Sequence, residues 1–371
     1  MPKDSGPADE RSLRIAFFSE AYPERNGTGT YYYDLITHLN DRVEQVEIFQ
    51  PLPDRRFNLM TLPLPGDRTQ QFVIPNPVRL RRAIDRLRPH LCISVTPGFF
   101  GIMGMLLAYR HQSGFISAYH TDFSALAELY WGPIKRRFGG YLLNTATRHL
   151  CLRSSTVLVN NNDLVSQVRS LGAQHVSIMG TPIEEVFLKT PTTTSPRKPD
   201  PVVFAGRLAP EKNIDTILNA ARRRPQKRFI IAGDGPLRES VERTADELDN
   251  LDYRGWLNRQ ALCGLLDEAG LVILPSHFET FGSIALEAMS RKRPVLITSN
   301  AGIHNWPEVA DSLCVLHPDD ILTDVLDRLD TTPESEWAAL GQRSRESALA
   351  LHEATMDHWL QVLRSHVRFD V

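Results

Sequence analysis

The sequence predicts an α/β protein built from two doubly wound domains, each with a parallel sheet. Short apolar runs alternate with longer segments of helical spacing, which is the pattern of strands and helices around a parallel sheet. This alternation occurs on both sides of a proline- and threonine-rich stretch at residues 190–201. The length of 371 residues also suits two domains of ordinary size.

The first domain is expected at residues 12–189. Its predicted strands are short apolar runs at Ile15–Ser19, Val46–Phe49, Leu91–Val95, Phe115–Tyr119, Thr156–Val159 and Val176–Met179. Helical spacing marks segments between them, at Tyr31–Leu39, Val78–Leu87 and Leu126–Leu150.

A linker is expected at residues 190–201, because Thr190–Pro201 contains four prolines and four threonines. The second domain is expected at residues 202–350. Its predicted buried strands are Val202–Ala205, Phe229–Ala232, Leu271–Leu274 and Val295–Thr298. Glu334–Val371 is predicted to be helical, and residues 351–371 are expected to cross back to the first domain.

Two such domains facing one another would form a cleft between the carboxyl ends of their strands. Ligands bind in that position in open α/β sheets. Motifs that directly follow predicted strands are therefore the candidates for a functional site.

Composition indicates the cellular context. The amino-terminal segment is polar and lacks the apolar core of a signal peptide. The longest apolar stretch, Phe99–Tyr109, is too short to span a bilayer. The four cysteines are widely spaced, which argues against a disulfide framework or zinc cluster and fits a reducing compartment. We therefore expect a cytoplasmic protein.

Charge is unevenly distributed along the chain. The net charge of −2 gives no bias toward nucleic acid. Residues 51–153 nevertheless contain 14 Lys and Arg against 5 Asp and Glu, whereas residues 301–350 contain 3 against 10. The basic region is either a solvated mixed surface or a surface that attracts anionic lipid or a phosphorylated acceptor.

The first motif follows the predicted strand Val202–Ala205. Gly206 permits close approach of the backbone to a ligand, and Arg207 and Lys212 add two cations beyond the strand end. The forked donors of Arg and the mobile charge of Lys suit a diphosphate. The alternative is a surface loop with ordinary basic residues.

Two further motifs are rich in glycine. Gly233-Asp-Gly235 permits a tight turn, and a structural turn is as consistent with it as a donor contact. It is not a dinucleotide fingerprint, because Arg238 stands where the third glycine belongs. Gly27-Thr-Gly29 follows the first strand and is weak evidence alone.

The segment from His277 to Glu287 is the most informative. Ser283–Met289 is a strong helix former, so Gly282 and Ser283 are expected at a helix amino terminus, which favours an anion such as phosphate. Glu279 on the preceding loop and Glu287 in the helix offer carboxylates to sugar or ribose hydroxyls. The alternative is a capped helix with a solvated glutamate.

In the first domain, His120 directly follows a predicted strand and is expected to project into the cleft. The alternative is a hydrogen-bonded structural histidine. The chain lacks a D-x-D triplet, an H-E-x-x-H motif and a G-x-S-x-G motif. These absences argue against a metal-dependent site and against a serine hydrolase.

Together these residues resemble glycosyltransferase family 4, which has the GT-B architecture of two Rossmann-like domains facing across a cleft. The most specific element is the E-x7-E motif at Glu279 and Glu287. Gly206-Arg207 and Glu211-Lys212-Asn213 stand at the expected distance upstream. The resemblance extends over nearly the whole chain.

The resemblance implies roles for the donor side. Arg207 and Lys212 would bind the donor diphosphate and stabilise the leaving group in place of a metal. Glu279 would hold the transferred sugar and Glu287 the ribose. The remaining donor contacts would come from Gly206, Gly233, Phe281, Gly282 and Ser283, with the base near Gly255-Trp256-Leu257.

It also implies roles in the first domain. His120 would contact the sugar near its anomeric carbon, and Gly27 and Gly29 would form the loop between donor phosphate and acceptor. The family's adjacent glycines are here separated by Thr28, and Gly180-Thr-Pro182 replaces the common Gly-Val-Asp. The first departure puts the acceptor side in doubt.

The implied activity is retaining transfer of a hexose from a UDP- or GDP-sugar to a lipid or glycan acceptor, without metal or other cofactor. No nucleophile for double displacement is evident, which favours same-face transfer in which the departing phosphate takes the acceptor's proton. The alternatives are a nicotinamide-dependent oxidoreductase and a non-catalytic nucleotide-sugar binding protein.

Tyr119-His-Thr-Asp-Phe123 looks like family members that glycosylate lipids. Apolar Phe99–Met105 and the pair Tyr130-Trp131, with Lys135-Arg136-Arg137, would then touch the inner face of the cell membrane as a peripheral contact. The alternative is a buried helix with a solvated charge run.

Overall fold

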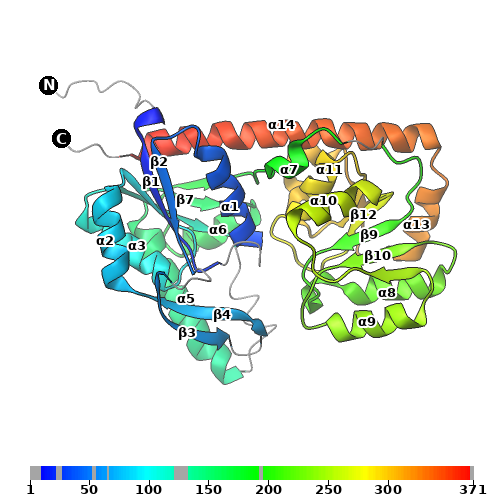
Figure 1. The fold of residues 1–371 in the computed structure, drawn as a ribbon, viewed down its shortest axis with the longest axis horizontal. Coiled ribbons are helices and arrows are strands. Elements are labelled where there is room, and N and C mark those ends of the chain that lie inside the picture. Colours follow the sequence, from blue (N-terminus) through cyan, green and yellow to red (C-terminus); the bar gives the residue numbers. More distant parts are fainter. Residues whose placement is uncertain are drawn as a thin grey trace. The chain divides into compact units, whose positions relative to one another are not determined.

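The computed structural model describes residues 10–21, 27–51, 56–64, 67–120, 133–191 and 195–367. The chain divides into two compact units (Figure 1). The first comprises Met1–Pro182 together with Thr355–Val371, and the second comprises Ile183–Ala354. Residues 190–201, which we expected to be a linker, belong to the second unit.

The first unit contains a six-stranded parallel sheet in the order β2-β1-β5-β6-β7-β8. The central strands are apolar on both faces, as expected where helices cover the sheet on both sides. The strands are β1 (Arg14–Phe18), β2 (Gln45–Phe49), β5 (Leu91–Ser94), β6 (Gly114–Tyr119), β7 (Val157–Val159) and β8 (Val176–Ile178).

Helices of the first unit pack on this sheet through two large apolar clusters. One contains Phe17, Tyr32 and Trp359, and the other contains Phe18 and Phe100. The described helices are η1 (Glu10–Ser12), α1 (Gly27–Leu39), α2 (Pro77–Leu87), α3 (Phe99–Arg110), α5 (Pro133–Arg153) and α6 (Asp163–Ser170).

An antiparallel hairpin of β3 (Asn58–Leu64) and β4 (Asp67–Pro75) stands apart from the parallel sheet. We did not expect these strands from the sequence. Register shifts near Asn58 and Pro63 break the regular pairing, and the proline cannot donate to a ladder. The hairpin therefore has no continuous strand pattern in the sequence.

The second unit contains another six-stranded parallel sheet, in the order β11-β10-β9-β12-β13-β14. Its strands are β9 (Val202–Ala205), β10 (Phe229–Ala232), β11 (Leu251–Tyr253), β12 (Leu271–Leu274), β13 (Val295–Thr298) and β14 (Cys314–Leu316). The strand order reverses between β10-β9 and β12, which places the switch point of a doubly wound sheet beside β9. The predicted architecture is confirmed, and β11 and β14 are additions to it.

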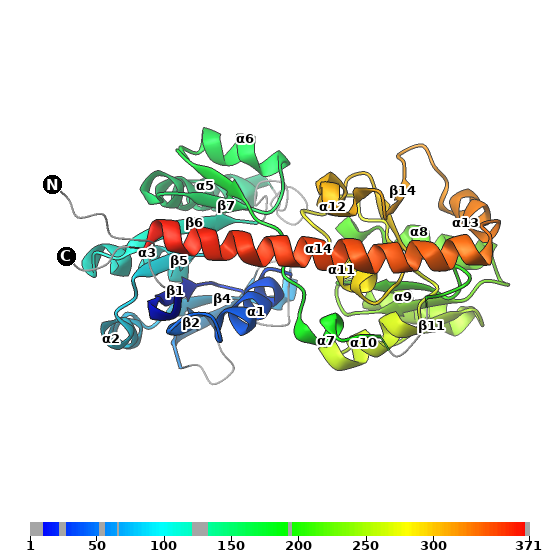
Figure 2. The ribbon, with the colours of Figure 1, turned by 90° about the horizontal axis from the view of Figure 1, so that it is seen from above.

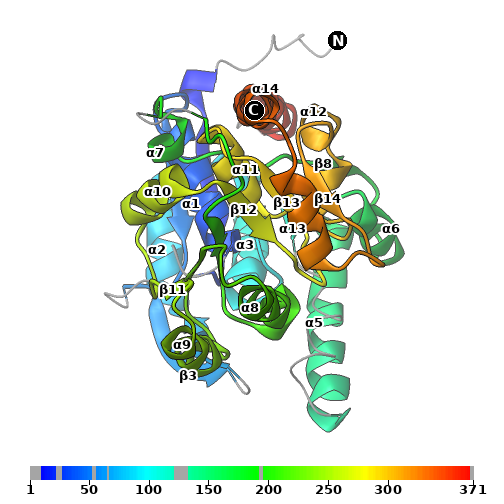
Figure 3. The same cartoon turned by 90° about the vertical axis from the view of Figure 1, so that its right-hand side faces the viewer.

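Helices cover both faces of this second sheet. Helices α8 and α9 lie on one face and α10 and α11 on the other (Figures 1 and 3). The helical elements are α7 (Glu185–Leu188), η2 (Pro210–Lys212), α8 (Ile214–Arg223), α9 (Arg238–Glu247), α10 (Arg259–Glu268), α11 (Ser283–Ser290), η3 (Gly302–Asn305), α12 (Pro307–Ala310) and α13 (Leu322–Asp330).

Helix α14 (Glu334–His366) runs unbroken over 33 residues (Figure 2). Its first part belongs to the second unit, where the indole of Trp337 donates to the carbonyl of Gly270 at 3.2 Å. From Thr355 onward it belongs to the first unit. The return of the C-terminal helix to the first domain is thus confirmed.

The last turns of α14 complete the core of the first unit. Trp359 is fully buried, and its indole nitrogen donates to the hydroxyl of Tyr31 at 2.9 Å. We expect Trp359→Ala to lower the free energy of unfolding of the first unit by about 3–5 kcal/mol, the usual cost of removing a buried aromatic side chain.

Chemical denaturation followed by circular dichroism measures this change. The matched control is Asp357→Ala, an exposed position on the same helix, which should stay within about 0.5 kcal/mol of the wild type. Equal effects of the two substitutions would contradict the assignment of this segment to the core.

Candidate functional site

The loops after β9 and β10 meet at the carboxyl edge of the second sheet. The amide of Gly206 donates to the carbonyl of Ala232 at 3.0 Å. A β carbon on Gly233 would lie 1.8 Å from the carbonyl oxygen of Gly206, and its φ of 142° also favours glycine. Glycine is therefore required at 233 to bring the two backbones together.

Arg207 and Lys212 lie in the loop and short η2 helix after β9. Arg207 Nη1 lies 3.3 Å from Glu211 Oε1, and Lys212 forms an ion pair with Glu279. The side chains of this second pair are only 18% and 15% exposed, so solvent screens their charges weakly. Both cations therefore lie just beyond the end of β9, where the sequence predicts them.

The loop after β12 carries the first glutamate of the E-x7-E motif. The amide of His277 donates to the carbonyl of Glu211 at 2.9 Å, which joins this loop to the one after β9. The carbonyl of Glu279 accepts from the amide of Gly302 at 2.9 Å, and that of Phe281 accepts from Ile303 at 2.8 Å. Backbone hydrogen bonds thus hold the loop on both sides.

Helix α11 begins at Ser283, as predicted. Its cap, Gly282, has φ 100°, and a β carbon there would lie 2.8 Å from a methyl group of Leu274. As a glycine, this cap residue supplies no side-chain hydrogen bond to the amide groups of the first turn. These amides and the positive end of the helix dipole suit an anion, beside the cations Arg207 and Lys212.

The two glutamates of the motif have different surroundings. Glu279 pairs with Lys212 at the loop, whereas the Glu287 side chain is 7% exposed and lies 2.9 Å from Arg259 Nη1. The alternative of a solvated glutamate at 287 is therefore wrong. A buried carboxylate held by one arginine can still offer its other oxygen to a hydroxyl.

The segment expected near the nucleotide base follows β11. The carbonyl of Gly255 accepts from the amide of Gly233 at 2.7 Å, which ties this turn to the glycine loop. Leu257 is partly buried against the core of the unit, and the indole of Trp256 is 57% exposed. The segment thus lies next to the loops that carry Gly206 and Gly233.

His120 lies at the carboxyl edge of the first sheet. We expected its side chain to project into a cleft, but in the structure the side chain is buried. It is 6% exposed, and its Nε2 lies 2.6 Å from the hydroxyl of Tyr32. Burial lowers the pKa of His120 to about 4 and raises the pKa of Tyr32. The side chain is therefore a neutral, hydrogen-bonded imidazole at physiological pH.

Other first-domain expectations have mixed outcomes. Gly27 and Gly29 lie in the first turn of α1, not in a loop, because the helix already begins at Gly27. Thr121–Phe123 and Tyr130-Trp131 lie outside the described residues. Lys135–Arg137 belong to α5, but their side chains also lie outside the described part.

Comparisons with known proteins agree with this geometry. The model of Glycosyltransferase Family 4 matches residues 25–185, and that of Glycosyl transferases group 1 matches residues 189–306. The chain belongs to the family 4-type glycosyltransferases of GT-B architecture.

Curated relatives of this glycosyltransferase act on several substrates. It is 26% identical to alpha-D-kanosaminyltransferase of Streptomyces kanamyceticus over 354 residues, 84% of this chain and 87% of the relative. It is 32% identical to D-inositol 3-phosphate glycosyltransferase of Mycolicibacterium paratuberculosis over 186 residues, 47% of this chain and 41% of the relative.

Solved structures show the same fold at low identity. Sucrose-phosphate synthase from Thermosynechococcus elongatus superposes with a TM-score of 0.71 at 17% identity, covering 95% of this chain and 98% of that one. Anabaena Alr3699/HepE in complex with UDP-glucose gives 0.66 at 16% identity, covering 94% and 100%.

Sequence reasoning missed three residues beside the predicted ones: Tyr32, Arg259 and Asn160. Asn160 follows β7, and the pairing of Tyr119 with Val159 sets it in register with His120. It is 6% exposed, and its Oδ1 has no hydrogen-bond partner among the described residues. Only the run of three asparagines after a strand, residues 160–162, could have drawn attention to it.

Among the described residues of the glycosyltransferase, no group of three or more His, Cys, Asp and Glu side chains could hold a metal ion. Nor does any described helix combine the length and apolar character needed to cross a membrane.

The buried imidazole of His120 makes stability depend on pH. Its pKa of about 4 lies below the ordinary 6.5, so between these values the unfolded chain binds a proton that the folded chain does not. We expect the unfolding free energy of the wild type to fall on acidification from pH 6.5 toward pH 4, by up to about 3 kcal/mol from this group.

Glutamine does not titrate in this range, and the His120→Gln variant retains an Nε2 atom for Tyr32. The unfolding free energy of the variant should therefore change less with pH than that of the wild type. Denaturant titrations at several pH values between 4.5 and 7.5 compare the two proteins. Parallel curves would show that His120 titrates normally in the folded state.

Proposed function

We propose that this glycosyltransferase moves a hexose from a UDP- or GDP-sugar to a lipid or glycan acceptor, with retention of anomeric configuration and without a metal ion. The observation that carries the proposal is that Arg207, Lys212 and the start of α11, capped only by the glycine at 282, follow strands at one edge of the second sheet. Two cations and a helix dipole can together neutralise a departing diphosphate.

The ion pairs around the site suggest how the donor binds. Lys212 pairs with Glu279, and Arg207 pairs with Glu211. A diphosphate would draw both cations to its oxygens and release Glu279 to accept from a sugar hydroxyl. In this way the carboxylate that balances Lys212 in the free protein becomes a sugar-binding group in the complex.

Retention is what the resemblance to family 4 implies, and the ion pairs bear on how it would be achieved. Glu211, Glu279 and Glu287 are each held by a cation of the site, and none is presented as an unpaired nucleophile. We therefore propose same-face transfer through an oxocarbenium-like state. The departing phosphate, stabilised by Arg207 and Lys212, would take the proton of the acceptor hydroxyl.

UDP and GDP are the donor nucleotides that we propose, and two similar proteins support them. Anabaena Alr3699/HepE binds UDP-glucose, and a Mycobacterium tuberculosis relative, 28% identical over 39% of both chains, is a GDP-mannose-dependent mannosyltransferase. The family membership decides against a nicotinamide-dependent oxidoreductase. A measurement of sugar transfer distinguishes the enzyme from a non-catalytic nucleotide-sugar binding protein, which would show no turnover.

Thermal unfolding in the presence of UDP-, GDP- and ADP-sugars tests the donor. A ligand at 100 times its dissociation constant stabilises the folded state by about 2.7 kcal/mol, so one nucleotide series should raise the melting temperature with concentration. Lys212→Ala and Glu279→Ala should weaken this shift and lower turnover by about 100-fold or more.

The matched control is Lys198→Ala, whose side chain is 72% exposed on the second unit away from the sheet edge. It should behave as the wild type does. Unchanged turnover in both Lys212→Ala and Glu279→Ala would contradict the assignment of these residues to the donor site.

We also propose that the acceptor is presented at an anionic membrane surface by the first unit, on the cytoplasmic side. Helix α2 and its cap carry five exposed arginines, at positions 79, 81, 82, 86 and 88, with Asp85 as the one acidic residue of the helix. Helix α3 packs against α2 and exposes Phe99, Leu106 and Tyr109. Basic residues beside exposed apolar ones favour anionic lipid.

Co-sedimentation with vesicles tests this surface. We expect binding to vesicles of anionic phosphatidylglycerol and little binding to neutral phosphatidylcholine. Because each basic residue near such a surface contributes about 1 kcal/mol, Arg82→Ala/Arg86→Ala should weaken binding by about tenfold or more. Arg222→Ala/Arg223→Ala on α8 removes the same charge from the second unit and should have no such effect. Equal losses would show non-specific attraction, and a glycan acceptor would then be favoured.

A further inference from the structure

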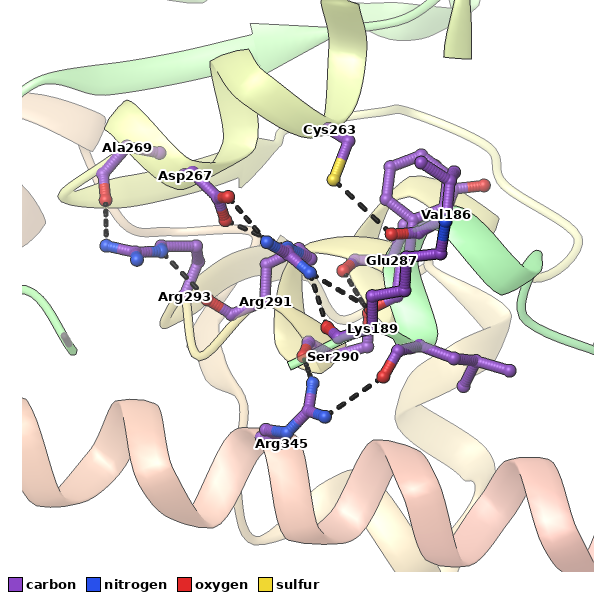
Figure 4. Close-up of polar contacts among 12 residues, drawn as sticks. Val186, Lys189, Cys263, Asp267, Ala269, Glu287, Ser290, Arg291, Arg293 and Arg345 are labelled. Carbon is purple, nitrogen blue, oxygen red and sulfur yellow. Dashed lines mark hydrogen bonds and ion pairs between the residues drawn. The ribbon is translucent and has the colours of Figure 1, made fainter. Parts of the chain in front are cut away.

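Glu287 stands at the middle of helix α11, and the carboxyl-terminal end of that helix is firmly held. Arg291 donates to the carbonyl of Lys189 at 2.6 Å and pairs with Asp267 (Figure 4). Arg345 from α14 donates to the carbonyls of Leu188 and Ser290. These contacts fix the helix backbone, but they do not touch the carboxylate of Glu287.

The carboxylate itself is held by Arg259, the first residue of α10. Arg259 Nη1 lies 2.9 Å from Glu287 Oε1, and its Nε pairs with Glu184. The guanidinium also lies over the ring of Phe187, with its central carbon 4.6 Å from the ring centroid. Two carboxylates and an aromatic face therefore set the plane of this guanidinium.

This arrangement uses one oxygen of Glu287 and leaves the other available. Within the described residues, Glu287 Oε2 has no hydrogen-bond donor. Yet the Glu287 side chain is only 7% exposed, so it has little freedom to turn. An anchored carboxylate with one open oxygen is suited to accept from a hydroxyl at a fixed position.

We propose that Arg259 is a positioning residue that directs Glu287 Oε2 toward a ribose hydroxyl of the donor nucleotide. The site then selects ribonucleotides over deoxyribonucleotides, and Glu184 keeps Arg259 in place. This inference rests on the proposed function and on the family resemblance, which implies that Glu287 binds the ribose of the donor. Arg259 lies two residues after Leu257, the last residue of the segment that the resemblance places near the base.

A contact that only tied α10 to α11 would affect stability without affecting nucleotide choice. The readout is therefore the ratio of dissociation constants for UDP and its 2′-deoxy and 3′-deoxy analogues, measured by calorimetry on the full chain. The GDP series is measured in parallel, so that either base provides the test.

For the wild type we expect about tenfold weaker binding when the hydroxyl that meets Glu287 is missing, the size expected for one hydrogen bond to a charged group. Arg259→Met should bring that ratio to within about twofold of unity. Arg259→Lys retains the charge without the fork and should give an intermediate ratio. Arg345→Met, which loosens only the helix end, should retain the wild-type ratio.

The outcomes separate the two proposals. A wild-type ratio in Arg259→Met, with a ratio near unity in Glu287→Gln, overturns the positioning role and leaves the ribose assignment intact. A wild-type ratio in Glu287→Gln overturns the ribose assignment itself. If Arg259→Met does not fold, Glu184→Gln replaces it, because it removes only the anchor at Nε. The expected result is then a reduced ratio, and an unchanged ratio overturns the inference.

Discussion

The close approach of the backbones at Gly206 and Gly233 is the constraint on which the donor half of the molecule depends. The carbonyl oxygen of Gly206 occupies the space that a β carbon on residue 233 would need. A parallel sheet brings all its strand ends to one edge, but side chains there would normally keep neighbouring loops apart. Without a side chain at 233, the loop carrying Arg207 packs directly on the next one.

The charges at the carboxyl edge of the second sheet are balanced by ion pairs. Arg207, Lys212 and Arg259 are each paired with a glutamate, so the free protein has no need of a bound anion to neutralise them. Partly buried charges would otherwise lose hydration without compensation. In the proposed binding mode, a donor would exchange partners within an existing set of charges.

Much of the second unit's fold can be predicted from the sequence, because its strands and the start of α11 are marked by patterns in neighbouring residues. The strands Val202–Ala205 and Leu271–Leu274 are continuous apolar runs, and the helix at Ser283 follows a glycine, so their order and ends can be read directly. Strand ends in turn gather Arg207, Lys212 and Glu279. Short β11 and β14, with three residues each, carry too little pattern to be recognised.

The side-chain partners were not predictable in the same way. Arg259 and Glu184 are 75 positions apart, and nothing in either neighbourhood indicates that Arg259 pairs with both Glu184 and Glu287. The sequence predicts that His120 directly follows a strand, and it does follow β6, but its hydrogen bond is to Tyr32, 88 positions away. Local pattern thus locates a residue on an element, whereas tertiary packing decides what that residue faces.

The path of α14 has a consequence for biosynthesis. The first unit obtains Trp359 and Leu363 from beyond the second unit, so its core stays incomplete until these residues leave the ribosome. The second unit, Ile183–Ala354, is a continuous segment and can close earlier. The half that is translated first is therefore the half that matures last, and in the interval its unfilled apolar face is a natural client for a chaperone.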